Sequence, residues 1–380
     1  MNKNFLPALG VMIGYIIGVG MFGLPFLVSK AGTVSFFLLL ILLGFTQYFV
    51  HLVYANVILS TKEFHRMPGY AGIYLGNKWK HFTFAAKLFG NLGALLAYII
   101  ITGIFLYQLL GPILGGNEFI YASILFFIQA TIIYFGVGFL SRVELLMSSF
   151  LLMVVIMLAI KGHSAIVAEN FMSIDWKYLF LPYGAMLFAL DGNGSLPIVA
   201  NLLKRDKKLM KKVVRLGTFI SALVIIAFTL TIVGISGAYT SEDSLVGVSA
   251  ILGNGVVTIA LVFGVLTMIT SFLGAAQSLR ETLCWDYGVH KFLGWALACF
   301  VPYSMYLLGF QNLISVISFV GAIAGGFSAI TLILIFMKLK RKKRKLIMFK
   351  YKPSSVITSL LICMFIAGLA YEIWVFLSAG

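Results

Sequence analysis

Two glycine-rich segments, each within a long apolar stretch, contain the residues best suited to bind a small solute. Residues 18–25 read Gly-Val-Gly-Met-Phe-Gly-Leu-Pro, and residues 191–197 read Asp-Gly-Asn-Gly-Ser-Leu-Pro. Glycine weakens a helix and proline cannot donate a helical hydrogen bond, so both segments predict an interrupted helix. Inside a bilayer, backbone groups freed in this way occur only where they line a cavity or contact protein. Paired interruptions half a chain apart therefore indicate a binding site for a transported solute.

The two interruptions predict complementary partial charges at one site. The second half of the first broken helix starts near Gly20, where free N–H groups favour a carboxylate. The first half of the other broken helix ends near Leu190, where free carbonyl groups favour an ammonium group or a cation. Both ends together suit a zwitterionic amino acid. The expected substrate-binding residues are Gly18, Gly20, Met21, Phe22, Gly23, Leu190, Gly192, Asn193 and Gly194, with Tyr98 from the middle of the third apolar stretch.

Asp191 is the only acidic residue that the sequence places deep in an apolar stretch. An ionisable group in a membrane is costly and usually functional, so Asp191 is the expected proton carrier. The alternative is that its carboxylate caps the second half of the broken helix.

Three hydroxyl residues in the eighth apolar stretch form a second candidate for ion coupling. Thr270 and Ser271 could hold a sodium ion together with carbonyl groups of the first stretch, because hard cations prefer oxygen ligands. Thr267 lies one turn earlier. The alternative is that these hydroxyls bond back to their own helix. Other polar residues in apolar stretches are expected to hydrogen-bond between helices; these are Gln47, His51, Gln108, Gln129 and Gln277.

The composition is that of an integral membrane protein. Of the 380 residues, 61% are hydrophobic and 11% are charged, against about 25% charged in soluble domains. The chain contains eleven stretches of the length that a helix needs to cross a bilayer. They lie near residues 5–28, 34–59, 88–111, 119–140, 143–161, 178–203, 213–237, 254–279, 292–309, 312–337 and 354–378.

The basic residues predict how these spans are oriented. Of the 28 Lys and Arg residues, all but Lys30, Lys161 and Lys177 fall on one side of the membrane if the spans alternate. The positive-inside rule then places the N-terminus in the cytoplasm and the C-terminus outside, in a cell membrane. The basic runs adjoin spans and accompany no binding module, which argues against nucleic acid. Residues 338–345 are expected to contact anionic lipid head groups.

The position of the two interruptions predicts an internal repeat. They fall in the first and sixth spans, so each unit that starts with an interrupted span contains five spans. A unit with an odd number of spans inserts upside-down relative to its copy, which gives a 5+5 inverted repeat. We therefore expect a single transmembrane domain, with repeats over 5–161 and 178–337 and an extra helix over 354–378.

Other functional classes fit the sequence less well. The pattern Gly18-x-Gly20-x-x-Gly23 matches a dinucleotide fingerprint, but that motif requires a βαβ unit rather than an apolar span. Three scattered cysteines form neither a disulfide framework nor a zinc site. The five histidines are dispersed, and no nucleophile lies at a fixed spacing from a base. We expect no enzyme activity, no cofactor and no metal other than a sodium ion at Thr270 and Ser271.

The sequence resembles a known family in three short stretches. Residues 17–25 resemble the first-helix signature of the bacterial tryptophan/tyrosine (hydroxy/aromatic amino acid) permeases. Residues 270–274, Thr-Ser-Phe-Leu-Gly, resemble the eighth-helix segment of that family, and Gly192-Asn193 followed by a proline resembles the sixth. The resemblance extends to the amino acid/auxin permease family and the APC superfamily. It implies a LeuT-like, all-α fold of eleven helices, with the backbone of Gly18, Gly20, Met21 and Gly23 around the substrate.

The resemblance also implies uptake of an amino acid together with a proton. One departure from the family pattern is Asp191, which stands where the family has a histidine, and it leaves the coupling ion and the substrate open. We expect a secondary active permease that takes up neutral, possibly aromatic, amino acids by proton symport and alternating access. The alternatives are a sodium-coupled symporter of small neutral amino acids and a membrane amino-acid sensor. The choice of amino acid, uptake against exchange, and the oligomeric state stay open.

Overall fold

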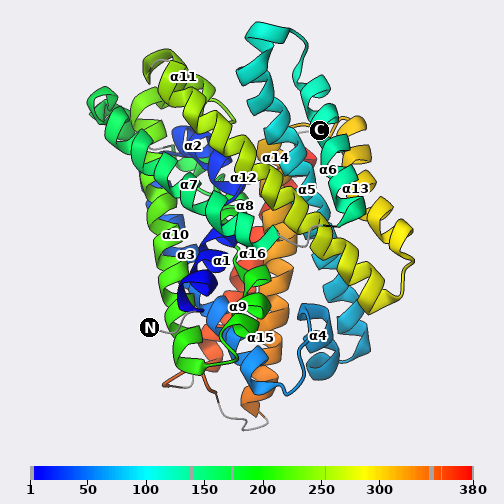
Figure 1. Ribbon diagram of the computed structural model, residues 1–380. Coiled ribbons are helices and arrows are strands. Elements are labelled where there is room, and N and C mark those ends of the chain that lie inside the picture. The colour runs from blue at the N-terminus through cyan, green and yellow to red at the C-terminus, as the bar shows by residue number, and fades with distance from the viewer. Residues whose placement is uncertain are drawn as a thin grey trace.

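The computed structural model describes residues 4–136, 140–172, 175–252, 254–341, 346–351 and 353–378, and over these residues it contains helices and no strand. The helices pack side by side into one bundle, with the N-terminus near one end and the C-terminus near the other (Figure 1). The α-helices are α1 (Phe5–Ile16), α2 (Gly20–Ala31), α3 (Thr33–Ser60), α4 (Met67–Leu75), α5 (Asn77–Leu114), α6 (Glu118–Phe135), α7 (Leu140–Gly162), α8 (Tyr183–Ala189), α9 (Leu196–Leu202), α10 (Lys207–Ser236), α11 (Val246–Leu252), α12 (Asn254–Glu281), α13 (Lys291–Leu307), α14 (Leu313–Val320), α15 (Gly326–Arg341) and α16 (Ser355–Ser378).

The prediction of an all-α membrane protein is confirmed. Among the described residues, seven helical segments are long and apolar enough to cross a membrane, and the bent pair α1 and α2 makes an eighth. Helices satisfy their own backbone hydrogen bonds, which is what a hydrocarbon environment requires. Helices or helix pairs also occupy the other expected ranges, as α7, α8 with α9, and α13, but these are shorter or less apolar. The count of eleven spans therefore stays a prediction.

The first and sixth expected spans are interrupted where the glycines predict. Helix α1 ends at Ile16 and α2 begins at Gly20, with a bend of 47° between them. Helix α8 ends at Ala189 and α9 begins at Leu196, and between them residues 193–195 form a single 3₁₀ turn. The two interruptions are in contact, because a Cβ added to Gly20 would lie 2.8 Å from the Cα of Ala189.

A third interruption was not predicted. Residues Gly321–Gly325 form a π-helical turn between α14 and α15, within the tenth expected span. A Cβ on Gly321 would lie 2.1 Å from the carbonyl oxygen of Gly184, so the backbones of α8 and the π-helical turn touch. Such turns occur frequently at functional sites.

The segment after α3 contains a short helix, α4, at the end of the bundle near the N-terminus (Figure 1). The Tyr74 hydroxyl lies 2.9 Å from the hydroxyl of Thr61, and the Tyr70 hydroxyl accepts from the backbone N–H of His65. Both tyrosines are buried. These hydrogen bonds therefore hold α4 against the end of α3, and α4 is not a free interfacial helix.

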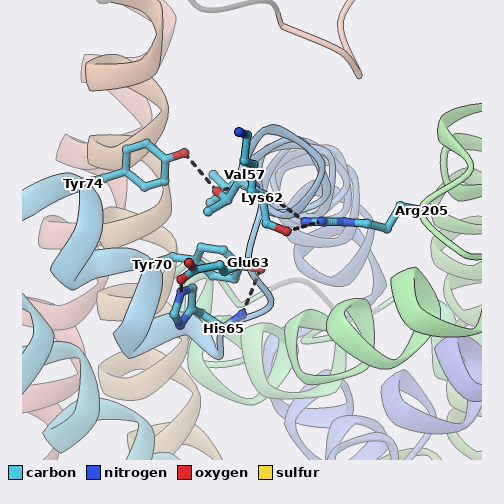
Figure 2. Close-up of polar contacts among 8 residues, drawn as sticks. Val57, Lys62, Glu63, His65, Tyr70, Tyr74 and Arg205 are labelled. Carbon is cyan, nitrogen blue, oxygen red and sulfur yellow. Dashed lines mark hydrogen bonds and ion pairs between the residues drawn. The ribbon is translucent and has the colours of Figure 1, made fainter.

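Arg205 binds the end of α3 by hydrogen bonds from the side opposite Tyr74. Its guanidinium donates to the carbonyl groups of Ile58, Thr61 and Lys62, which are left without helical partners where α3 ends. Figure 2 shows Tyr74 and Arg205 approaching this turn from opposite directions. The contact joins the segment after α9 to α3. Of the basic run 338–345 that was expected to contact lipid, residues 342–345 lie outside the described residues.

Candidate functional site

A cavity of about 350 Å³ lies between the two interrupted spans. One wall is formed by the break between α1 and α2 and by the break between α8 and α9. The other walls come from α5, α12 and the π-helical turn. Six of the residues predicted from the sequence line it, namely Gly18, Gly20, Tyr98, Asp191, Gly194 and Ser271. Residues about 180 positions apart in the chain therefore share one chamber.

The wall opposite the breaks consists largely of small residues. Gly90 and Ala94 come from α5, Gly274 and Ala275 from α12, and Ala324 from the π-helical turn. Small side chains leave space between closely packed helices. Phe188 of α8 adds apolar surface beside the first break, since a Cβ on Gly20 would lie 2.8 Å from its ring. The walls from α5 and α12 also carry polar residues, among them Asn91, Gln277 and Ser278, so small and polar side chains alternate around the chamber.

The lining of the chamber extends toward one end of the bundle. Toward the end of the bundle that carries α4, the lining continues to the half-buried residues Arg66, Lys87 and Glu281. Toward the other end, the buried ring of Phe22 packs edge-on against Phe105 and Phe228, with ring centroids 5.1 and 5.4 Å away. These three rings form an aromatic plug.

The start of α2 is partly engaged by its own chain. The N–H groups of Met21 and Phe22 donate to the carbonyl oxygens of Gly18 and Val19 at 3.2 and 3.1 Å. No side chain caps the helix. The partial positive charge of the helix start therefore faces a chamber lined by Gly18, Val19 and Gly20.

Several predicted site residues do not line the chamber. Met21, Phe22 and Gly23 point into the packing of α2, and a Cβ on Gly23 would lie 2.4 Å from the Cδ1 of Ile317. Leu190, Gly192 and Asn193 are buried behind the second break. Consecutive residues of a helix turn point in different directions, so a sequence segment cannot line one surface throughout.

Asp191 lines the chamber and also caps the second break. Its Oδ1 accepts from the backbone N–H of Asn193 at 3.0 Å and from the side-chain amide of Asn193 at 2.6 Å. A carboxylate at the start of a helical turn stabilises free N–H groups in this way. This contact lies within the break, at the 3₁₀ turn of residues 193–195, whereas α9 itself begins after Ser195 without a side-chain cap. The expected cap of the second half-helix is therefore not formed by Asp191.

Asp191 is not the only acidic residue buried in a span, and this part of the sequence interpretation is wrong. Glu372 on α16 is 5% exposed, and its Oε1 accepts from the backbone N–H of Gly184 at 3.1 Å. Gly184 lies in the first turn of α8, so a carboxylate there is favoured. The sequence hides this contact because Glu372 lies near the end of its span, where a charged residue can equally well reach water.

His51 is the second residue that sequence reasoning underrated. It was expected only to bond between helices, and its bond reaches the backbone of the second break. Its Nε2 lies 3.0 Å from the backbone nitrogen of Gly192 in the second break, and its Nδ1 lies 3.1 Å from the hydroxyl oxygen of Thr218 on α10. The ring is fully buried.

The hydroxyl residues of α12 divide between the two interpretations. Thr267 donates to the carbonyl of Phe263 at 2.8 Å and Thr270 donates to that of Thr267 at 2.9 Å, so both bond back to their own helix. Ser271 lines the chamber. Within the described parts of the chain, no group of three or more His, Cys, Asp and Glu side chains is arranged to hold a metal ion.

The glutamines in the spans differ in their hydrogen-bond partners. Gln108 of α5 donates to Asp243 at 2.5 Å and so bonds across the bundle as predicted. Gln277 donates to Glu281 on its own helix at 2.9 Å. Over the residues that the structure describes, the buried amide of Gln47 and the amide nitrogen of Gln129 have no hydrogen-bond partner, so the prediction of interhelical bonds is wrong for Gln47 and Gln277.

Comparison with known proteins adds one match. The sequence profile of the tryptophan/tyrosine permease family matches residues 1–372. A comparison with curated proteins found no match for the chain. The family match covers both interrupted spans, the chamber and most of α16.

Proposed function

The chain belongs to the tryptophan/tyrosine permease family, and from this premise we propose that it is a secondary active transporter that carries a neutral, aromatic amino acid across the cell membrane. The observation that carries the proposal is the chamber between the two interrupted spans. It is closed on one side by the aromatic plug and continues on the other to half-buried charged residues. One-sided access to a central chamber is what alternating access requires of one of its states.

The breaks supply recognition for the two charged groups of an amino acid. The start of α2 at Gly20 favours the carboxylate, and the end of α8 at Ala189 favours the ammonium group. Asp191, beside the end of α8, adds a negative charge to the same wall. Tyr98 faces Gly18 across the chamber, since its hydroxyl would lie 3.5 Å from a Cβ at that position.

The small residues of the opposite wall support an aromatic side chain in the substrate. Gly90, Gly274 and Ala324 carry little or no side chain and leave room for a bulky group, and an aromatic ring gains much from the apolar area that it buries. A chamber of about 350 Å³ is large enough for one amino acid with a few water molecules, since one water occupies about 30 Å³ of liquid volume.

The proposed function also includes an assignment of the repeats and of the orientation in the membrane. We assign the two halves of an inverted repeat to α1–α7 and α8–α15, with α16 as the extra helix of a LeuT-like fold. With the N-terminus in the cytoplasm, the open end of the chamber faces inward and the aromatic plug of Phe22, Phe105 and Phe228 closes the outer side. The C-terminus then lies outside, at the opposite end of the bundle from the N-terminus (Figure 1).

We propose that uptake is coupled to protons. Asp191 belongs to the coupling machinery through its charge and its place at the second break. The sodium alternative rests on Ser271, which lines the chamber, and on the neighbouring Thr270 and Thr267, whose hydroxyls are already engaged with their own helix. Those bonds leave the hydroxyl oxygens as acceptors, so a test of coupling must include both ions.

The experiment is uptake of a panel of labelled amino acids into proteoliposomes that contain the purified protein. A proton gradient and a sodium gradient are imposed separately, and unlabelled competitors cover small, aliphatic, aromatic and charged side chains. The proposal predicts accumulation of an aromatic amino acid under the proton gradient alone. Accumulation of a small amino acid that requires sodium would replace it with the sodium alternative. Binding of an amino acid without any transport would favour a sensor.

A further inference from the structure

The hydrogen bonds of His51 determine which of its nitrogens carries a proton. A backbone N–H can only donate, so Nε2 must accept from Gly192 and carries no hydrogen in this conformation. The single proton of the neutral ring is then on Nδ1, and it is donated to the Thr218 hydroxyl at 3.1 Å. The two partners thereby assign a neutral imidazole with one defined tautomer.

Protonation of His51 and the present form of the second break exclude each other. A proton added to Nε2 would face the N–H of Gly192 across 3.0 Å, and two donors repel at that distance. Gly192 is held close on its other side as well, because a Cβ there would lie 2.8 Å from Ile16. A charged His51 therefore requires the backbone at Gly192 to turn away, and that backbone is part of the chamber's broken helix.

The surroundings of His51 contain one charge that favours the imidazolium. Asp191 is the residue that precedes Gly192 in the second break, and a carboxylate near an imidazolium stabilises its charge. The other ionisable groups on the elements around the ring are Tyr54 on α3 itself, Tyr15 on α1, and Arg215 on α10, one turn from Thr218 and beside Tyr48.

The remaining elements packed against α3 bring no further charge to the ring. Helix α9 has no ionisable side chain, and α8 has only Tyr183 near its outer end. Helix α2 carries Lys30 in its last turn, and α15 carries its basic residues in its last turn. The ionisable groups around the ring are thus one imidazole, the Asp191 carboxylate, the Arg215 guanidinium and the tyrosine hydroxyls.

We propose that His51 carries the coupling proton and that Asp191 serves as its counter-charge. In the outward-facing state, the lone pair of Nε2 takes one proton from water on the outer side and forms the imidazolium. As the second break returns to the present arrangement, Nε2 releases the proton toward Asp191, which lines the inward-facing chamber, and water there takes it up. The Gly192 N–H then donates to the freed lone pair. No other bond is made or broken, and one proton crosses in each cycle. This inference rests on the proposed function and names a residue for its coupling.

The test variant is His51→Gln. Glutamine offers an amide oxygen to Gly192 and an amide N–H to Thr218, but it takes up no proton. The matched control is His163→Gln, since His163 is exposed in the turn after α7. Both proteins are reconstituted with the labelled amino acid that the wild type transports. Exchange against internal unlabelled substrate and accumulation under a proton gradient are measured side by side.

We expect His51→Gln to exchange substrate at a rate within a few fold of the wild type and to lose gradient-driven accumulation, while His163→Gln keeps both. Accumulation by His51→Gln at the wild-type level would overturn the inference and leave the proposed function intact. A wild-type protein that exchanges no amino acid at all would instead overturn the proposed function. Accumulation that only sodium drives would overturn the inference together with the proposed proton coupling, and would leave amino-acid transport itself intact.

A conformational readout tests the inference without a substrate. Ala324→Cys, in a protein whose three native cysteines are serine, reports access to the chamber from the inner side through its labelling rate with a water-soluble maleimide added to the inner face of the membrane. At each pH the rate is divided by that of the same cysteine in the His51→Gln background, which cancels the chemistry of the thiol. Because one proton is involved, the ratio should fall with decreasing pH by up to about tenfold per pH unit. A ratio that does not change with pH contradicts the inference.

A second variant covers the case in which His51→Gln does not fold. Thr218→Val keeps the histidine and removes the acceptor of its Nδ1–H, a hydrogen bond that is stronger for the imidazolium. The midpoint of pH-dependent labelling at Ala324→Cys should then move to lower pH. An unchanged midpoint would show that another group titrates.

Discussion

Gly20 provides the strictest test of how the two interrupted spans fit together. A Cβ at this position would lie 2.8 Å from the Cα of Ala189 and 3.0 Å from its nitrogen, and both are backbone atoms. Ordinary contacts of a Cβ begin at 3.4 Å, so Gly20→Ala forces α2 and α8 apart by about half an ångström. Overpacking of this kind costs about 1–3 kcal/mol. The shift also displaces the start of α2 from its place in the chamber wall.

The assay compares Gly20→Ala with Gly44→Ala, whose added Cβ meets no atom within 4 Å. Thermal unfolding in detergent and exchange of labelled amino acid in proteoliposomes are measured for both proteins. Gly20→Ala should unfold at a lower temperature and exchange at least about tenfold more slowly, because small displacements at a binding site are costly. Gly44→Ala should match the wild type. Wild-type stability and exchange in Gly20→Ala would refute the close approach of the two breaks.

The remaining predictions concern the plug, the buried carboxylate and the alternative coupling ion. Phe22→Leu removes two edge-on ring contacts and should weaken outer closure by about 1–3 kcal/mol in total, measured as faster labelling of a chamber cysteine from outside in right-side-out vesicles. Glu372→Gln keeps an acceptor for Gly184 and should be stable, whereas Glu372→Leu should lose about 1–3 kcal/mol in thermal unfolding; equal stability of the two variants would argue against the hydrogen bond. Asp191→Asn should reduce proton-driven accumulation more than exchange, because the counter-charge of the coupling site is lost. Ser271→Ala should leave proton-driven uptake within about twofold of the wild type, since a deleted hydroxyl that binds no ion costs little; loss of uptake that added sodium restores would support the sodium alternative.

The parts of the fold that the sequence predicts depend on backbone chemistry that single residue types control. Gly18, Gly20 and Pro25 in one span, and Gly192, Gly194 and Pro197 in the other, disfavour a continuous helix whatever surrounds them. The π-helical turn at Gly321–Gly325 was not predictable in this way. Its glycines fit α8 at close approach, and that approach depends on how distant spans pack.

For the site residues too, what the sequence predicts depends on residue type, and what it misses depends on tertiary packing. Asp191 and Ser271 were identified because a polar residue in an apolar span is conspicuous, and both line the chamber. Met21 and Phe22 were included because they belong to the motif, but their side chains point away from the chamber. His51 looked like any polar residue in a span, since its importance comes from a partner 141 positions away in the chain. Partner identity is a tertiary property that spacing along one helix does not reveal.

The most direct measurement of the central claim is an experimental structure of the protein with its transported amino acid bound. The account predicts that the amino acid occupies the chamber between the two breaks, with a carboxylate oxygen within about 3 Å of a backbone N–H at the start of α2. Its side chain should lie against the small residues of α5 and α12, such as Gly90 and Gly274. An amino acid bound outside this chamber, or one whose carboxylate makes no contact with residues 18–22, would contradict the account.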